Sequence, residues 1–322
     1  MTTLRDPGDV IAMVPYVLGF TPVDSMVMVA LVGQRKRLGA CLRLDLPHSA
    51  DDGSAVARYL VGVASAHRFA TVLLVAFTPD ERRAAQVMQP LRRGLALGRI
   101  KVADALRADG KRWWSYTCHD PGCCSPDGTP YDPDSTRVAA EAVVAGLTRA
   151  TDRDSLRTRL EPLSEGARLD TLRECAARAA AIKAGDAALP CSRDVDALLR
   201  RHLAAPGEMP AADAATLLLA MQNFRLRDAA WAGLSRTDAA EQLELWCHVM
   251  RTAPDELLAP VGALAGFAAW LAGQGALAWH AVERVESVSP TYPMCVLLRG
   301  ILDAAVSPDV WDKLPERPSP GS

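Results

Sequence analysis

Three cysteines and a histidine lie close together near the middle of the chain. The segment from 111 to 134 reads KRWWSYTCHDPGCCSPDGTPYDPD and places Cys118, His119, Cys123 and Cys124 among proline and glycine residues that favour turns. Thiolate and imidazole groups are ligands that zinc prefers in proteins. Zinc sites usually take their ligands from two separated segments, however, and adjacent residues rarely both bind one ion. Zinc binding is therefore one of three interpretations of this loop.

The second interpretation is a disulfide that joins Cys118 to Cys123 or Cys124, because a short Pro-Gly turn can bring these positions together. Such a bond would be structural or redox-active. The third interpretation is a reduced, well-packed loop. A catalytic thiolate at Cys123 or Cys124 would need a base, and His119 is the nearest candidate. The other five cysteines stand singly in apolar or helical segments, and we expect small buried side chains at Cys41, Cys175, Cys191, Cys247 and Cys295.

A basic cluster precedes the cysteine loop. Between residues 82 and 112 the chain carries nine basic side chains against Asp104 and Asp109, and a pair of tryptophans follows at once. Positive charge beside aromatic rings is what proteins use to bind single-stranded nucleic acid. The alternative is that the tryptophans pack a strand onto the core while the arginines lie on a solvated helix face. The candidate contact residues are Arg82, Arg83, Arg92, Arg93, Lys111, Arg112, Trp113 and Trp114.

Composition and motifs exclude several classes of function. The 36 basic and 38 acidic residues leave a net charge of −2, which excludes a uniformly basic nucleic-acid coat but not a local basic patch. The chain has no phosphate-binding glycine loop and neither the H-E-x-x-H nor the G-x-S-x-G motif. Asp24 and Asp45 would act as metal ligands or as a general base only if they converged, and turn roles are more typical of such positions.

Alternating strand and helix patterns fill the first half of the chain. Apolar or alternating runs predict strands at 25–32, 38–46, 71–77, 100–106 and 112–118, and helical spacing predicts helices at 7–18, 53–67, 80–97 and 135–147. The first two strands are predicted to form a hairpin, and the continuous apolar run at 71–77 indicates a central strand. We therefore expect a layered α/β domain with a mixed sheet at 1–149, which contains a Cys-rich loop at 118–134.

The second half of the chain has helical periodicity and is rich in alanine, leucine and arginine. We expect an all-helical domain at 150–314 and a disordered tail at 315–322, where proline, serine and glycine dominate. Gly266, Gly273, Ala278 and Pro290 have the spacing of the small residues and the proline of a tetratricopeptide repeat, but the repeat's large aromatics are missing at the matching positions. A generic helical hairpin is the alternative.

Length and composition favour a two-domain protein of the cytoplasm. The chain has 322 residues, of which 49% are hydrophobic and 23% charged, as is ordinary for a soluble globular protein. Its first residues lack the charged start, apolar core and cleavage site of a secretory signal. The most apolar stretch, at 261–271, is too short to span a bilayer. We therefore expect a cytoplasmic location and no membrane association.

Four stretches resemble a known family. They are LRDPGDVIAMVPYVLGFTPVDSMVMVAL at 4–31, LRLDLP at 42–47, WSYTCHDPGCCSPDGTP at 114–130 and AWLAGQGALAWHAVERV at 269–285. Together they resemble the actinobacterial domain-of-unknown-function family 4192 over nearly the whole chain. The resemblance implies a cytoplasmic actinobacterial protein. It implies no activity, because the family has no established one.

We expect a non-enzymatic adaptor that binds a protein partner through its helical domain. This interpretation is favoured because the sequence has no nucleophile or phosphate motif and because its second half is helical. The first alternative is a thiol- or metal-centred enzyme or redox sensor that uses the Cys118–Cys124 loop, with zinc as the candidate cofactor. The second is a nucleic-acid-associated protein that uses the basic cluster at 82–112. Substrate, partner identity and oligomeric state stay open.

Overall fold

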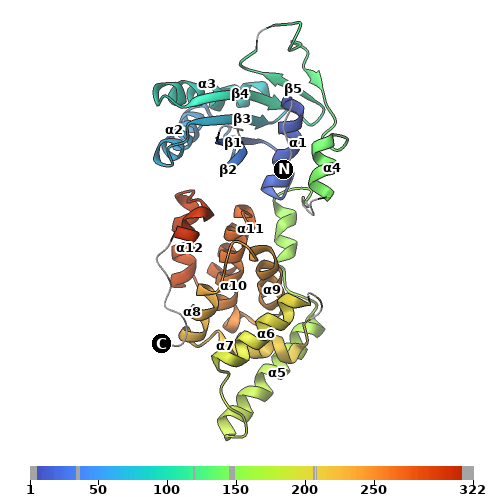
Figure 1. Cartoon of the computed structure of the whole chain (residues 1–322), viewed down its shortest axis with the longest axis vertical. Helices are drawn as coiled ribbons and strands as arrows, with labels where there is room; N and C mark the ends of the chain where they lie inside the picture. Colours follow the sequence, from blue (N-terminus) through green and yellow to red (C-terminus); the bar gives the residue numbers. More distant parts are fainter. Residues whose placement is uncertain are drawn as a thin grey trace. The chain divides into compact units, whose positions relative to one another are not determined.

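The chain divides into two units, residues 1–153 and 154–322. The computed structural model describes residues 6–33, 37–118, 120–144, 149–205, 207 and 209–313 (Figure 1). The predicted tail at 315–322 lies outside the described residues, as does His119. Of the helices in these ranges, none is long and apolar enough to cross a membrane.

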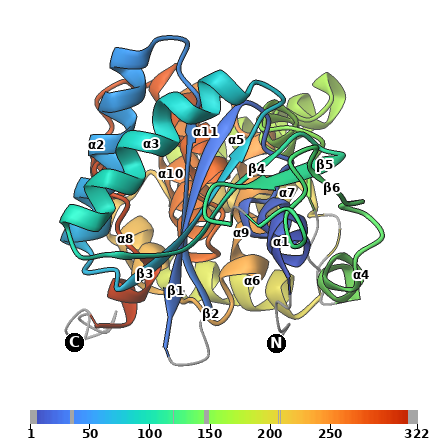
Figure 2. The same ribbon diagram turned by 90° about the horizontal axis from the view of Figure 1, so that it is seen from above.

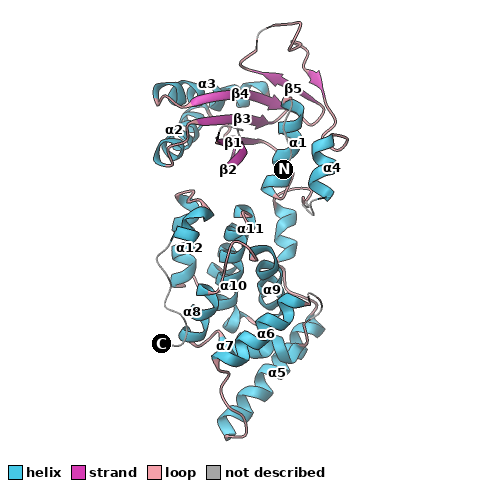
Figure 3. Ribbon diagram, viewed as in Figure 1, coloured by secondary structure: helices cyan, strands magenta, loops and turns pink. Residues whose placement is uncertain are grey.

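Six strands form one mixed sheet in the first unit, in the order β2-β1-β3-β4-β5-β6 (Figure 3). β3 and β4 are parallel, and the other neighbouring pairs are antiparallel. The structure confirms the mixed sheet, the hairpin of the first two strands and the central place of the strand at 71–77. The strands span Ser25–Val32 (β1), Arg37–Asp45 (β2), Thr71–Phe77 (β3), Lys101–Ala108 (β4), Arg112–Ser115 (β5) and Thr129–Pro130 (β6).

Helices cover both faces of this sheet (Figure 2). Successive side chains of a strand point to opposite faces, so Met26 and Met28 of β1 lie in one apolar core and Val27 and Val29 lie in the other. The first core is completed by α2 (Ala50–Ala66) and α3 (Glu81–Leu97), and the second by α1 (Pro7–Leu18). A fourth helix, α4 (Arg137–Val144), packs on α1.

Three strands finish, and β1 starts, at the same end of the sheet. Ser25, where β1 starts, pairs with Asp45 at the end of β2 and with Phe77 at the end of β3. Phe77 in turn pairs with Ala108 at the end of β4. β2, β3 and β4 therefore run in the same direction, and the loops that leave their carboxyl ends lie side by side.

Two strand predictions near the cysteine loop differ from the structure. The predicted strand at 112–118 ends at Ser115, because the Ser115 hydroxyl oxygen accepts the N–H groups of Thr117 (3.1 Å) and Cys118 (3.0 Å) and turns the chain away from the sheet. The two-residue strand β6 was not predicted, since so short a segment carries no alternating pattern.

The second unit is helical throughout its described part (Figure 3). Gly262 and Gly266 of α10 let neighbouring helices approach closely: a Cβ at Gly262 would lie 2.4 Å from Val285, and one at Gly266 would lie 2.7 Å from Leu298. The elements are η1 (Asp154–Arg159), α5 (Glu165–Ala184), α6 (Ser192–Ala204), α7 (Ala211–Ala220), α8 (Phe224–Ala232), α9 (Ala239–Thr252), α10 (Asp255–Leu271), α11 (Gly275–Glu286), α12 (Pro293–Asp303) and η2 (Pro308–Lys313).

The four residues that suggested a tetratricopeptide repeat all lie between the start of α10 and the start of α12. Gly266 is in α10, Gly273 has a φ of 76° and follows the end of that helix, Ala278 is buried in α11, and Pro290 lies between α11 and α12. These positions suit a helical hairpin, and the likeness to the repeat stays a prediction.

Candidate metal centre

Three cysteine sulfurs meet in the loop that joins β5 to β6. The Sγ atoms of Cys118, Cys123 and Cys124 all lie within 4.8 Å of one another, and those of Cys123 and Cys124 are 3.9 Å apart. All three are free thiols; Cys123 is exposed and the other two are partly buried. His119, the fourth predicted ligand, is outside the described residues. The structure thus brings together the predicted residues that it describes.

The spacing of these sulfurs suits a tetrahedral thiophilic ion. With Zn–S bonds of about 2.3 Å, two sulfurs of a tetrahedral zinc site lie about 3.8 Å apart. The separation of 3.9 Å between Cys123 and Cys124 is close to that value. Cys118 also lies within reach, because its sulfur needs to move by no more than about an ångström. Among the described residues, no other group of three or more histidine, cysteine or acidic side chains gathers in this way.

A tight turn at Asp120 makes the two adjacent cysteines converge. The Asp120 carbonyl accepts the N–H groups of both Cys123 (3.0 Å) and Cys124 (2.7 Å), and its side chain accepts the N–H of Gly122 at 2.9 Å. Such a turn is typical of an Asp that is followed by proline and glycine. In a helical turn, neighbouring side chains are about 100° apart rather than opposite, so both sulfurs can face Cys118.

The sheet holds the first end of the loop through Asp104 of β4. Its Oδ1 atom accepts the hydroxyl groups of Thr117 (2.6 Å) and Ser115 (3.2 Å), and Ser115 in turn accepts the N–H of Cys118. The first cysteine is therefore linked to the sheet by a short chain of hydrogen bonds. The sequence analysis did not single out Asp104 for this role, although an acidic residue within an apolar strand was a detectable signal.

Trp114 and Gly128 hold the far end of the loop. The Trp114 indole N–H donates to the Pro126 carbonyl over 3.2 Å, and the Arg107 guanidinium lies 3.6 Å from the centre of the Trp114 ring. Gly128 has a φ of 83°, and a Cβ there would lie 2.5 Å from the ring. Only glycine fits without displacing the indole. Arg112 adds a hydrogen bond of 2.8 Å to the Gly128 carbonyl.

Two of these thiols, Cys118 and Cys124, hold their protons unequally. The backbone N–H of Asp120 and then the Cys124 thiol lower the pKa of Cys118. Burial against the second core, together with the hydrogen bonds to Cys118 and Cys123, raises the pKa of Cys124 to about 12. Cys118 therefore ionises before Cys124, and the Cys124 thiol donates to the sulfur of Cys123.

One known protein family matches nearly the whole chain. A family model described as a domain of unknown function, DUF4192, matches residues 7–309. The chain belongs to the DUF4192 family. No curated protein matches it, and no solved structure matches it. The three sulfurs of this DUF4192 chain lie within the stretch at 114–130 on which the resemblance to the family depended.

The remaining cysteines of the DUF4192 chain lie apart from this cluster. Cys175, Cys247 and Cys295 are buried, and the partly buried Cys41 packs against the second core, so these four agree with the predicted small apolar role. The prediction was wrong for Cys191, which is exposed. It stands at the start of α6, where its backbone N–H donates to Asp194 over 2.9 Å.

Half of the predicted nucleic-acid contact residues are engaged within the fold. Trp113 is buried in the second core, and Arg107 covers one face of the partly buried Trp114 ring. Arg83 and Arg112 are engaged by backbone carbonyls of neighbouring loops. The other four residues of the set lie on the surface or partly so, namely Arg82, Arg92, Arg93 and Lys111.

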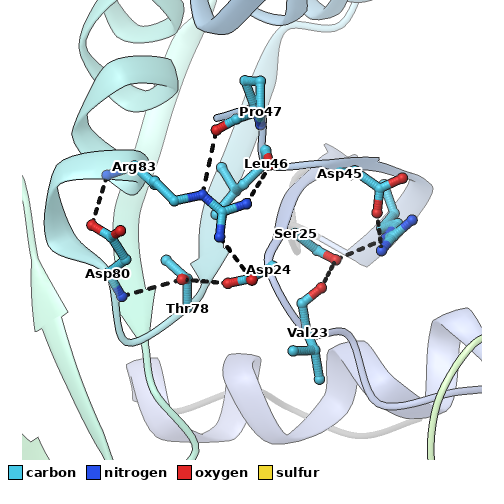
Figure 4. Close-up of polar contacts among 10 residues, drawn as sticks. Val23, Asp24, Ser25, Asp45, Leu46, Pro47, Thr78, Asp80 and Arg83 are labelled. Carbon is cyan, nitrogen blue, oxygen red and sulfur yellow. Dashed lines mark hydrogen bonds and ion pairs between the residues drawn. The ribbon is translucent and has the colours of Figure 1, made fainter. Parts of the chain in front are cut away.

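The acidic residues at the strand ends are engaged separately (Figure 4). Asp24 accepts the Thr78 hydroxyl at 2.6 Å and the Arg83 guanidinium at 2.7 Å, and these hydrogen bonds lower the pKa of its carboxyl group. Asp45 instead pairs with Arg43 at 2.6 Å. Arg83 also donates to the Leu46 carbonyl at 2.6 Å. Asp24 thus serves to join three loops, and its partners differ from those of Asp45.

Proposed function

We propose that the chain binds one zinc ion through Cys118, Cys123 and Cys124, and that the ion holds the loop between β5 and β6 in its folded conformation. The observation that carries this proposal is the gathering of three free thiols at nearly the separation that tetrahedral zinc requires. Sulfur ligands favour zinc over magnesium or calcium, which take oxygen ligands. Three thiolates leave the fourth position for a water molecule or another side chain.

Metal titration of the full, reduced chain tests the proposal. We expect native mass spectrometry to show one zinc ion per chain, and Co²⁺ to give the absorption of a tetrahedral thiolate complex. Cys118→Ser or Cys124→Ser should abolish both signals, since two thiolates bind zinc much more weakly than three. Cys191→Ser is the matched control, because it removes an exposed thiol outside the cluster.

Two results would contradict zinc binding. A purified chain whose mass is lower by two hydrogens, and is restored by reductant, would indicate a disulfide among the three cysteines and favour the redox-sensor alternative. An unmodified chain that takes up neither metal would leave the loop as a packed, reduced segment.

For the helical unit we propose the adaptor role that the sequence predicts. Its support is α5, a helix of 20 residues of which only Thr171 and Cys175 are buried. Leu169 and Leu172 are three residues apart, so they share one face of the helix, and both are more than 40% exposed. Affinity capture should lose the partner when both leucines become glutamate and keep it in Arg173→Glu. An identical set of captured proteins in the two variants would refute this role for α5.

A further inference from the structure

Three arginines of the helical unit surround the carboxyl end of α9. Arg251 lies in the last turn of α9, Arg284 on α11 and Arg168 near the start of α5. Arg284 donates to the Met250 carbonyl over 3.2 Å. The next carbonyl, that of Arg251, accepts the N–H of Leu163 just before α5 at 3.0 Å. These contacts bring α5, α9 and α11 together at the end of α9, where the charges of Arg168 and Arg251 both act on the Arg284 guanidinium.

Two of these arginines have donors without partners, whereas Nε of Arg251 donates to the Glu161 carbonyl over 3.0 Å. Nη1 of Arg284 and Nε of Arg168 are both buried and make no hydrogen bond. A buried donor without a partner is destabilising, and more so when the group is charged. No described carboxylate forms an ion pair with Arg168, Arg251 or Arg284. Other arginines of this unit are ion-paired, namely Arg157 with Glu283, Arg159 with Glu244 and Arg299 with Glu286.

The nearby groups do not neutralise this charge. Burial, together with the positive charges of Arg168 and Arg251, lowers the pKa of Arg284 to about 10. Asp255, in the first turn of α10, acts in the opposite direction but is not within ion-pair distance. The adjacent Cys247 supplies no negative charge, because burial raises the pKa of its thiol to about 12. The cluster therefore lacks an anion.

We propose that Arg168, Arg251 and Arg284 bind a phosphate group, either as inorganic phosphate or as the monoester of a small molecule. A phosphate carries close to two negative charges at neutral pH and offers several acceptor oxygens, which suits three guanidinium groups. Arg168 and Arg251 are partly exposed, so the anion can approach from solvent on their side. This site shares no residue with the zinc site, and its test is independent of the metal.

Titration of the full chain with inorganic phosphate and, separately, with phenyl phosphate tests the proposal. Ionic strength is held constant with chloride, so that general screening does not contribute. We expect saturable binding by calorimetry and a rise in melting temperature with at least one of the two. Binding of phosphate alone identifies a site for the free anion, whereas tighter binding of phenyl phosphate identifies a monoester site.

Single variants show whether the three arginines form the site. Arg284→Gln and Arg168→Gln should each weaken phosphate binding at least about tenfold, the loss expected for one charge-assisted hydrogen bond. Arg299→Gln is the control, because it removes a guanidinium that Glu286 already neutralises, and its binding should be unchanged. The Arg168 variant keeps the test valid if Arg284→Gln fails to fold. Absence of binding in the wild-type chain, or unchanged binding in both cluster variants, would overturn the proposal.

Discussion

The contact between Gly128 and Trp114 gives a direct test of how the cysteine loop is held. Gly128→Ala would place a methyl group 2.5 Å from the indole, at a position whose φ is 83°. The indole would have to move, and the loop would lose the fixed point that follows its cysteines. We expect this substitution to destabilise the β5–β6 region by more than the cost of the left-handed backbone conformation alone.

The magnitude follows from three contributions. A left-handed backbone costs a residue other than glycine about 1–2 kcal/mol. Displacement of the ring weakens its contact with Arg107, which is worth about 0.5–2 kcal/mol, and its hydrogen bond to Pro126, worth about 0.5–1.5 kcal/mol. Since Trp114 is only partly buried, we take the lower part of each range and expect a loss of about 2–3 kcal/mol.

Gly110→Ala is the matched control for backbone conformation. Gly110 lies in the turn between β4 and β5 with a φ of 93°, and a Cβ there would meet no atom within 4 Å. Gly110→Ala should therefore cost only the penalty for a left-handed backbone, about 1–2 kcal/mol. The difference between the two variants isolates the contact with Trp114.

Hydrogen exchange followed by mass spectrometry is the suitable assay. The chain has two units, so a single unfolding transition of the whole protein would mix their stabilities. Exchange of peptides from β4 and β5 reports the local opening free energy directly. If both variants lose the same protection, the ring contact contributes nothing and our account of the loop is wrong. Zinc affinity should fall in Gly128→Ala and stay near the wild-type value in Gly110→Ala.

Two further predictions concern the packing of each unit. Asp24→Asn should lower the stability of the first unit by about 1 kcal/mol at neutral pH. The folded state lowers the pKa of Asp24, so this contribution to stability is fully present above pH 3.8, the ordinary pKa of the group. It is lost as the pH falls through the lowered pKa of the folded state. The denaturation curves of variant and wild type should therefore converge in acid. In the helical unit, Gly262→Ala should lower the free energy of unfolding by about 1–3 kcal/mol, because the new methyl group overpacks against Val285. Gly300→Ala has open space around its Cβ, so it should raise the free energy of unfolding by up to about 1 kcal/mol. Urea unfolding measures both changes. A loss in Gly300→Ala equal to that in Gly262→Ala would refute the packing argument.

The strands of the first unit were predictable because their patterns are local. The run from Ser25 to Val32 is apolar at nearly every position, and the structure buries its first six residues between two helical layers. The helix predicted at 7–18 also begins at a local signal, since Asp6 accepts the N–H of Asp9 over 2.9 Å just before Pro7. In each case, the residues that determine the element lie within it or next to it.

The contacts that join the ends of the strands cannot be predicted from local sequence patterns. Asp24, Thr78 and Arg83 are far apart in the chain, yet they form one network at the edge of the sheet (Figure 4). The sequence predicted turn roles for the acidic residues at these ends but gave no partner for Arg83, which it placed in a basic surface cluster. The charge of Arg83 instead joins the loops that follow β2 and precede β1, through Leu46 and Asp24.

The same distinction applies to the cysteine loop, where spacing did not show that the three sulfurs lie together. Adjacent residues such as Cys123 and Cys124 point to opposite sides of an extended chain, which argued against a shared ion. The Asp120 carbonyl accepts both of their N–H groups, and the resulting turn brings the two sulfurs to 3.9 Å from each other. Asp104 then holds Cys118 beside them through Ser115. The residues that gather the three sulfurs are therefore the hydrogen-bond acceptors that set the backbone, and cysteine spacing alone does not reveal them.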